Sequence, residues 1–506
     1  MATVYTGRKK ITIPVSETQF LEDPIKYIDQ YLGSCLNTND DNAKECEELQ
    51  KVYLGEQEIL TKTRVNGDSK NNNTVVINHS FRQVEFKKGF TIGNPIEYSM
   101  AVEREENDDL SNLTKYFNDC GKAAKDIDKY EDLYKFGIAL QYIIPKTEDY
   151  DHDNEAPFEL YNLEVGKAFK VYSSDAKGSP LFDVIISSEL DDSFTSQTLY
   201  EVYYMTSSGK CVFTTYDKDK KNTGTSEVQP QPFLPIIEYS LNKNRMGIVE
   251  TTLLLGNAIN LISSNQIDNL IDFVNSYIVF ENLDTKKDWD KTVEAMRRTR
   301  TIRLKSSNPQ LPAKVYTLQD TLQHNEINSL YDILKKEMYD INAVPQSSGS
   351  VTSGGDTGEA RILGNGWESA QNQAKVDTTY VSQFEREFLK KVFKICETTS
   401  GTLLDTISPN DIAIKYSINM SNNIYTKVQA ANLLYDMNFP YEKILSTCEL
   451  TSDIHGVGKE WRDLDESRKA SENSQSETSN NETPNSETST ETVDNQVAET
   501  TQVDEA

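Results

Sequence analysis

The strongest constraint on the fold is a long helical periodicity in the last third of the chain. Apolar residues recur at intervals of three, four or seven over residues 359–396, from Leu363 and Trp367 to Val392 and Ile395. A helix of that length extends ~55 Å. Gly364 and Gly366 lie in its first turns and would permit a bend there. The helix has more apolar surface than one small domain covers, so we expect it to pack within a larger assembly.

The remaining periodicities predict an α+β fold. Short runs with strand alternation, separated by polar turns, fill residues 137–239. Helical spacing returns after Pro235 and again near residue 319, and the mixed segment between these two helices begins and ends with β-like runs. The predicted order is helix 24–60, helix 110–136, strands 137–239, a helix after Pro235, mixed segment 279–320, helix 319–341, helix 359–396, strand 412–418, and helices 424–437 and 441–447.

The net charge limits how this chain can meet nucleic acid. With 506 residues the chain should form several structural units. Its formal charge of -28 argues against a surface that clamps DNA, because phosphate binding needs a basic face. An acidic surface suits either a conduit past which DNA slides or a protein that never meets DNA. Beyond residue 470 the sequence is polar and acidic with almost nothing apolar, which predicts a disordered tail.

The motifs of enzymes and metal sites are absent from the sequence. Residues 345–358 are rich in Gly and Ser, which predicts a flexible loop, but they lack the Lys that a phosphate-binding loop requires. The six cysteines and four histidines are scattered and have no metal-ligand spacing, so we expect reduced thiols, no metal and no cofactor. We expect no enzymatic activity, and no apolar run approaches the ~20 residues of a membrane span.

One basic cluster stands out against the acidic background. Only Asp288, Asp290 and Glu294 oppose it. Two interpretations remain open, a solvated helix face and a docking surface for an acidic partner or for DNA phosphates. The cluster consists of Lys286, Lys287, Lys291, Arg297, Arg298, Arg300, Arg303 and Lys305.

Three local stretches, in this order, resemble the portal proteins of tailed bacteriophages, of the type found in long-tailed siphophages. The first runs from Val76 to Ile96, with the family's Gly and Pro at Gly93 and Pro95. The second, residues 344–360, is similar to the family's tunnel loop and the start of its long helix. The third, residues 420–453, loosely resembles the crown. The resemblance covers about residues 45–466.

This resemblance implies a division of the chain into named parts. It implies a channel-lining role for Gln346, Ser347, Ser348, Ser350, Val351, Thr352 and Ser353 in the tunnel loop, and a clip that carries the basic cluster. The implied parts are an N-terminal segment (1–60), an α/β wing (61–247), a stem helix (248–278), the clip (279–320), a second stem helix (321–344), the tunnel loop (345–358), the long helix and a wing return strand (359–419), the crown (420–466) and the acidic tail (467–506).

The resemblance also implies the partners. Portals of this family assemble as twelve-subunit rings at one capsid vertex, where the clip faces the terminase motor and later the head-tail connector, and double-stranded DNA passes through the channel. Contacts with the major capsid and scaffolding proteins follow, in a virion assembled in the host cytoplasm without a membrane. Two alternatives stay open, a virion scaffold or adaptor without a ring, and an enzyme that processes nucleic acid.

Overall fold

The computed structural model describes residues 7–62, 72–101, 110–147, 150–151, 155–190, 196–274, 277–281, 310–312, 314–318, 324–346, 366–399, 407–418, 424–448, 450–451 and 454–478. They fall into two compact units, Met1–Ser421 and Asn422–Ala506, which we describe separately. Helices and strands both contribute throughout the first unit, which confirms the predicted α+β class.

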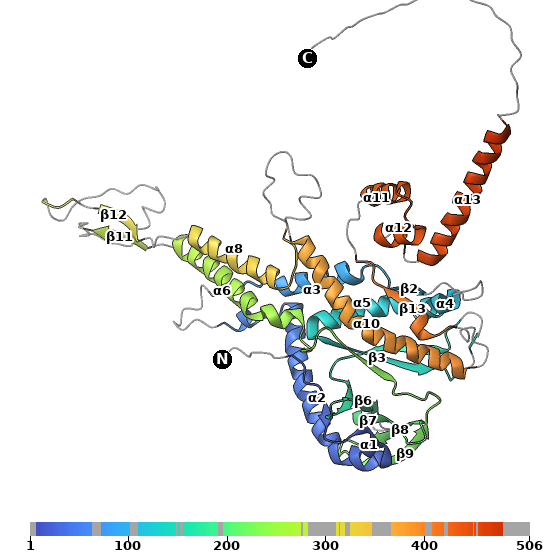
Figure 1. Cartoon of the computed structure of the whole chain (residues 1–506). Helices are drawn as coiled ribbons and strands as arrows, with labels where there is room; N and C mark the ends of the chain where they lie inside the picture. The colour runs from blue at the N-terminus through green and yellow to red at the C-terminus, as the bar shows by residue number, and fades with distance from the viewer. Residues whose placement is uncertain are drawn as a thin grey trace, which may run out of the picture. The chain divides into compact units, whose positions relative to one another are not determined.

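The larger sheet of the first unit has six strands in the order β1-β5-β6-β7-β8-β9. Neighbouring strands are antiparallel except β1 and β5, which pair in parallel with Thr12 opposite Tyr172. Helices α1 (Glu17–Glu22) and α2 (Pro24–Leu54) pack against this sheet through Phe20, Ile28 and Leu32 (Figure 1). The strands are β1 (Thr12–Ile13), β5 (Ala168–Ser173), β6 (Pro180–Leu190), β7 (Ser196–Met205), β8 (Cys211–Tyr216) and β9 (Asn222–Val228).

Helix α2 connects two cores. It starts with Pro24, after an Asp23 side chain that accepts a hydrogen bond from the Lys26 amide, and it ends at Gly55. Its first half contributes Ile28 and Leu32 to the core under the six-stranded sheet, and its second half contributes Leu49 and Tyr53 to the main core. The N-terminal segment is therefore part of the cores of the first unit.

The main core lies against a second, three-stranded antiparallel sheet in the order β10-β3-β4. Tyr130, Leu133, Ile143, Phe388 and Val392 are fully buried in it. A separate antiparallel pair joins β2 to β13, with Ile412 opposite Met100. The elements around this core are α3 (His79–Ile92), β2 (Glu97–Met100), α4 (Ser111–Asp119), α5 (Lys122–Phe136), β3 (Ile138–Pro145), β4 (Phe158–Leu163), β10 (Ile236–Ser240), α10 (Trp367–Thr398), η3 (Pro409–Asp411) and β13 (Ile412–Lys415).

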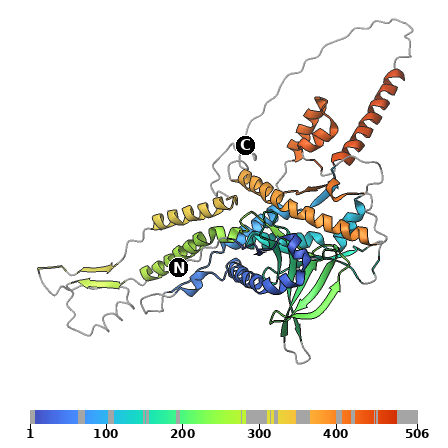
Figure 2. The ribbon, with the colours of Figure 1, turned by 60° about the horizontal axis from the view of Figure 1, so that its bottom comes forward.

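Two long helices of the first unit pack side by side, α6 (Ile248–Val274) and α8 (His324–Ile341) (Figures 1 and 2). Ile259 of α6 lies in one apolar cluster with Tyr331, Leu334 and Met338 of α8. Strand β11 (Tyr277–Glu281) follows α6 and pairs antiparallel with β12 (Lys314–Leu318), which precedes α8. The strand-like ends predicted for segment 279–320 are thus the two strands of one hairpin.

The second unit is a small helical cluster made of α11 (Ile424–Asp436), α12 (Tyr441–Cys448) and α13 (Ile454–Thr478). The Trp461 ring stacks on Tyr435 at 5.8 Å between ring centroids. The Asp465 carboxylate accepts hydrogen bonds from the hydroxyls of Tyr435 and Tyr441 at 2.6 and 2.5 Å. One carboxylate on α13 therefore joins α11 to α12.

Several predicted boundaries are wrong. The helix predicted over residues 24–60 ends at Leu54, because Gly55 adopts a left-handed conformation (φ 95°). The helix predicted over residues 110–136 is two helices, because Gly121 adopts a left-handed conformation (φ 63°) that ends the regular hydrogen bonding between α4 and α5. Gly366 does not bend the long helix from within, since it is the left-handed N-cap (φ 81°) at which α10 starts. The tail predicted from residue 467 begins later, because α13 continues to Thr478.

Several elements have no counterpart among the predictions. They are β1, α1, α3, β9, β10 and α13, and β10 stands where a direct change from Pro235 into a helix was expected. Strand β1 has only two residues, too few for an alternation, and β10 is buried along its whole length rather than on one face. The small helix expected near Trp289 lies outside the described residues.

Candidate functional site

Most of the predicted site residues lie outside the described part of the chain. All eight basic residues from Lys286 to Lys305 do so, as do Ser347, Ser348, Ser350, Val351, Thr352 and Ser353. Gln346 is described, and its side-chain amide donates a hydrogen bond to the Lys336 carbonyl at 3.1 Å. The described chain therefore defines the base from which the predicted tunnel loop departs.

The described residues on the two sides of the predicted loop, Pro345 and Gly366, lie close together. The chain leaves α8 through Ala343, Val344 and Pro345 and enters α10 at Gly366. A Cβ atom built on Gly366 would lie 3.8 Å from the Pro345 Cα, so the backbone at these two residues lies close together. The segment between them begins and ends at one point of the first unit.

Aromatic packing on α3 holds both ends of this segment. Phe86 packs against the cluster that contains Val344, and it also contacts the Trp367 ring, with 5.8 Å between ring centroids. Phe90, one turn further along α3, lies 5.9 Å from the same Trp367 ring. One face of α3 therefore supports the exit from α8 and the entry into α10.

A buried amide network fixes the end of α8 to the start of α6. The Asn342 side-chain amide donates to Gln83 Oε1 at 2.5 Å and to the Ile248 carbonyl at 3.1 Å. Its carbonyl oxygen accepts from the Thr251 hydroxyl at 2.8 Å, and Gln83 donates to the Met338 carbonyl at 3.2 Å. Sequence reasoning used Asn342 only as the first residue of the helix stop Asn342-Ala343-Val344-Pro345 and did not identify these side-chain contacts.

A buried histidine lies beside this network. His79 Nδ1 is 3.0 Å from the Tyr339 hydroxyl, and the Arg82 guanidinium lies 5.7 Å from the centre of the Tyr339 ring. Burial, together with the positive charges of Lys335 and Arg82, lowers the pKa of His79 to about 4. His79 is therefore neutral near pH 7, and this junction is suited to packing and hydrogen bonding rather than to proton transfer.

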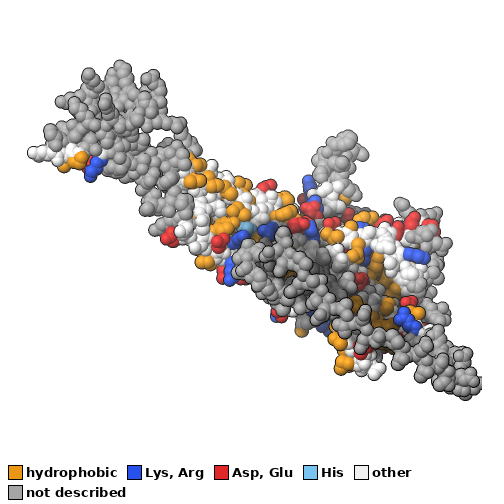
Figure 3. All heavy atoms as spheres, turned by 90° about the horizontal axis from the view of Figure 1, so that it is seen from above, with side chains coloured by type: hydrophobic (Ala, Val, Ile, Leu, Met, Phe, Trp, Pro, Cys, Tyr) orange, Lys and Arg blue, Asp and Glu red, His pale blue; other side chains and the backbone are white. Residues whose placement is uncertain are grey.

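The α6 and α8 helices expose apolar side chains on faces that they do not turn toward each other. Leu254 and Leu261 are seven residues apart on α6, while Leu330, Ile333 and Ile341 recur on one face of α8. These five side chains are 44–56 % exposed. Hydrophobic side chains gather along this part of the molecule in the space-filling view (Figure 3). Such apolar faces mark sites of protein contact.

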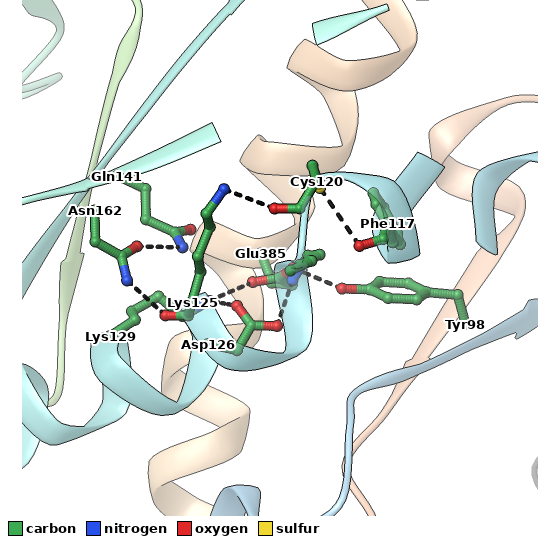
Figure 4. Close-up of polar contacts among 10 residues, drawn as sticks. Tyr98, Phe117, Cys120, Lys125, Asp126, Lys129, Gln141, Asn162 and Glu385 are labelled. Atoms are coloured by element: carbon green, nitrogen blue, oxygen red, sulfur yellow. Dashed lines mark hydrogen bonds and ion pairs between the residues drawn. The ribbon is translucent and has the colours of Figure 1, made fainter. Parts of the chain in front are cut away.

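A buried charge cluster anchors α10 to α5 (Figure 4). The Lys122 ammonium lies 2.6 Å from Asp126 and 2.7 Å from Glu385, and the Lys129 ammonium lies 2.7 Å from Asp126 and 3.0 Å from Glu385. The Tyr98 hydroxyl donates to Glu385 at 2.7 Å. Two ammonium groups thus balance two carboxylates, and we call these four charged residues the ion cluster.

The ion cluster is structural rather than catalytic in its geometry. Its four charged residues are at most 3 % exposed, so no substrate reaches them. Burial acts to raise the pKa of Glu385, but Lys122, Lys129 and the Tyr98 hydroxyl outweigh it and hold that pKa well below its usual range. The cluster therefore keeps Glu385 ionised and ties α10 to α5.

A second buried charge site involves the N-terminal arm. The Arg8 guanidinium lies 2.8 Å from Glu250 in the first turn of α6 and 3.0 Å from Glu45 on α2. Arg8 is 2 % exposed. The arm therefore fastens the beginning of α6 to α2.

The described residues meet neither the requirements of a metal site nor those of a membrane-spanning helix. Within the described ranges, no group of three or more His, Cys, Asp or Glu side chains is arranged to hold a metal ion. In the same ranges no helix combines the length and the apolar character that crossing a membrane requires. The features that stand out are a loop base, two exposed apolar faces and buried anchors.

Comparison with known proteins identifies the family. No curated protein matches the chain. The model of the family described as "Phage portal protein, SPP1 Gp6-like" matches residues 32–476, which include nearly all the described elements from α2 to α13. The match confirms the resemblance found in the sequence, and the chain belongs to the SPP1 Gp6-like family of phage portal proteins.

Proposed function

We propose that twelve copies of this chain form a closed ring at one capsid vertex, with a channel for DNA packaging, retention and ejection. The observation that carries the proposal is the pair of exposed apolar faces on α6 and α8. A cyclic ring is built from one repeated contact between two different faces of the subunit. The faces at Leu254 and Leu261 and at Leu330, Ile333 and Ile341 supply such a pair.

The parts of the portal then correspond to the described elements. The six-stranded sheet without β1, the three-stranded sheet and α3 to α5 form the wing (61–247), while β1 belongs to the N-terminal segment (1–60). Helices α6 and α8 form the stem (248–278 and 321–344). The β11–β12 hairpin forms the root of the clip (279–320), α10 with β13 forms the long helix and return strand (359–419), and the second unit contains the crown (420–466).

The tunnel loop (345–358) would line the channel. Gln346, Ser347, Ser348, Ser350, Val351, Thr352 and Ser353 include no basic residue, so DNA contact there is steric and free of tight phosphate binding. Support comes from the base of the loop, where Pro345 meets Gly366 on the α3 face. A loop attached at one point of each subunit suits a ring of identical loops around an axis.

The basic cluster of the clip would dock the terminase large subunit during packaging and the head-tail connector afterwards. Its eight positive charges would be repeated around the ring and would attract an acidic partner. Contacts of the wing and crown with major capsid and scaffolding proteins complete the set of partners. The ring would assemble in the host cytoplasm and remain in the virion.

Reversing Arg297, Arg298 and Arg300 to Glu should leave the rings intact and weaken binding of the motor and the connector. The loss should be greater at low salt, where screening of the clip charges is least. Binding measured at several ionic strengths tests this, with the exposed Lys218, Lys443 and Lys459 reversed as a control of equal net charge. Normal binding by the triple variant at every ionic strength would mean that the cluster is only a solvated helix face.

Deleting residues 479–506 should not affect ring assembly. This acidic, polar segment has too little apolar surface to offset the entropy of ordering it. The truncated and full-length chains are compared by mass measurement in solution. A truncated chain that stays monomeric while the full-length chain forms rings would assign the tail a structural role.

End-on electron microscopy with a mass measurement tests the ring itself. A ring of twelve has a mass of about 690 kDa, twelve times the chain mass of 57.3 kDa, and shows a central channel. A monomer at all salt concentrations would instead favour the alternative, a virion scaffold or adaptor without a channel.

A further inference from the structure

An extended segment of the wing lies along the α6 helix in a regular hydrogen-bond pattern. The backbone amide of Asn73 donates to Asp268 Oδ1 at 2.9 Å and that of Val75 donates to Ser264 Oγ at 3.0 Å. The Ile77 amide donates to Asn260 Oδ1 at 2.8 Å. Every second amide of the segment is thus paired with every fourth side chain of the helix.

The amides of the extended segment and the acceptors on the helix can pair in register because the two repeat distances are nearly equal. Alternate amides of an extended chain point the same way and repeat every ~6.6 Å, while side chains four apart on a helix repeat every ~6 Å on one face. The segment runs antiparallel to α6, since residue 73 meets residue 268 and residue 77 meets residue 260. Asn260, Ser264 and Asp268 therefore form a ladder of acceptors, which we call the polar ladder.

The polar ladder is buried, so each of its acceptors needs a donor from the protein. Asn260, Ser264 and Asp268 are each 0 % exposed. Side-chain contacts add to the ladder at both ends, from Asn260 to Gln57 and from Asp268 to the side-chain amide of Asn73 at 2.9 Å. A buried acceptor that loses its donor has no water to replace it.

The gripped segment is fixed to the wing at the end that follows residue 77. After residue 77 the Asn78 side chain caps α3 by accepting from the Phe81 amide at 3.1 Å, and it donates to the Tyr53 carbonyl of α2 at 2.8 Å. Before the segment, the Asn72 side chain donates to the Lys62 carbonyl at 2.8 Å, and the Lys62 ammonium donates to Asn265 of α6 at 2.6 Å. A segment anchored on α2 and α3 therefore holds the second half of α6.

We propose that Asn260, Ser264 and Asp268 are positioning residues that grip residues 73–77 and thereby fix the direction in which the α6 and α8 helices leave the wing. The grip itself is independent of the ring. Its consequence for the portal, that the ladder sets the tilt of the stem around the channel, rests on the proposed function.

Hydrogen exchange at single-residue resolution on the full-length chain tests the grip. The amides of Asn73, Val75 and Ile77 should exchange slowly and those of Thr74 and Val76 quickly, because no described residue accepts from the latter two. Ser264→Ala should speed exchange at Val75 roughly tenfold, while Ser264→Thr, which keeps the hydroxyl, should not. Equal exchange at all five amides, or an unchanged Val75 in Ser264→Ala, would overturn the proposal.

A distance measurement tests the direction of α6 and α8. Spin labels at Asn37 on α2 and Glu326 on α8, both exposed, report the separation of wing and stem in a Cys120→Ser background whose other cysteines are buried. The distance distribution should broaden in Ser264→Ala/Asp268→Ala and stay narrow in Ser264→Thr/Asp268→Asn. An unchanged distribution in the double alanine variant would refute the positioning role, whether or not the chain forms rings.

Discussion

Replacing Glu385 by alanine is expected to lower the free energy of unfolding by about 3–5 kcal/mol. The change removes one of the two carboxylates that balance Lys122 and Lys129 inside the core. Asp126 alone would then face two buried ammonium groups, which are 3 % and 1 % exposed and cannot be resolvated in place. Chemical denaturation of the purified chain measures the loss.

A matched control lies on the same helix. Glu397 pairs with Lys394 at 2.8 Å, but both side chains are half exposed, so Glu397→Ala should cost about 0–1 kcal/mol. Equal losses for Glu385→Ala and Glu397→Ala would contradict the account of the ion cluster as a buried anchor.

The same cluster predicts how stability depends on pH. The pKa of Glu385 is lower in the folded chain than in the unfolded chain, so its stabilisation is complete above the unfolded value of about 4.3. It is lost as the pH falls from there through the folded pKa, because the unfolded state binds the proton first. The stability difference between the unmodified chain and Glu385→Gln should therefore shrink below about pH 4.

The second large effect concerns assembly. Replacing Leu330 and Ile333 of α8 by glutamate should abolish the ring and leave a folded monomer. Both side chains are about half exposed in the single chain, so the change costs little there, whereas in a ring it would bury two carboxylates in an apolar contact. Mass measurement in solution distinguishes the monomer from the ring.

Val228 provides the control for this experiment. It is 62 % exposed on β9, the edge strand of the six-stranded sheet, and it is not on α6 or α8. Val228→Glu should therefore leave rings intact. Rings formed normally by Leu330→Glu/Ile333→Glu would mean that another face of the subunit makes the repeated contact.

The sequence predicted the helices and strands whose signals are local. The helical period and the stop at Pro345 predicted α8, and alternation predicted β3 to β8. It could not locate helix breaks that depend on backbone conformation. Gly121 and Gly366 adopt left-handed angles at such breaks, but a Gly within a helical periodicity does not by itself show that the helix is interrupted there.

Some features of the candidate site could likewise be predicted from the sequence, and others could not. The sequence identified the Gly/Ser loop and the basic cluster, because composition alone makes them stand out, and their roles stay predictions. It did not identify the polar ladder. Asn260, Ser264 and Asp268 accept hydrogen bonds from amides that lie more than 180 positions away along the chain.

By itself the sequence determined the α+β class, the order of the helices and strands in outline, and membership of the portal family, because periodicity and motif order are properties of the chain. Only the tertiary structure decided which charges are buried. One face of α5 carries Lys122, Asp126 and Lys129, and the charges alone would predict that this face is exposed to solvent. These residues can lie in the core because Glu385, 256 positions beyond Lys129, pairs with the two lysines there. A charge is buried only where its partner is brought to it, and that depends on the fold.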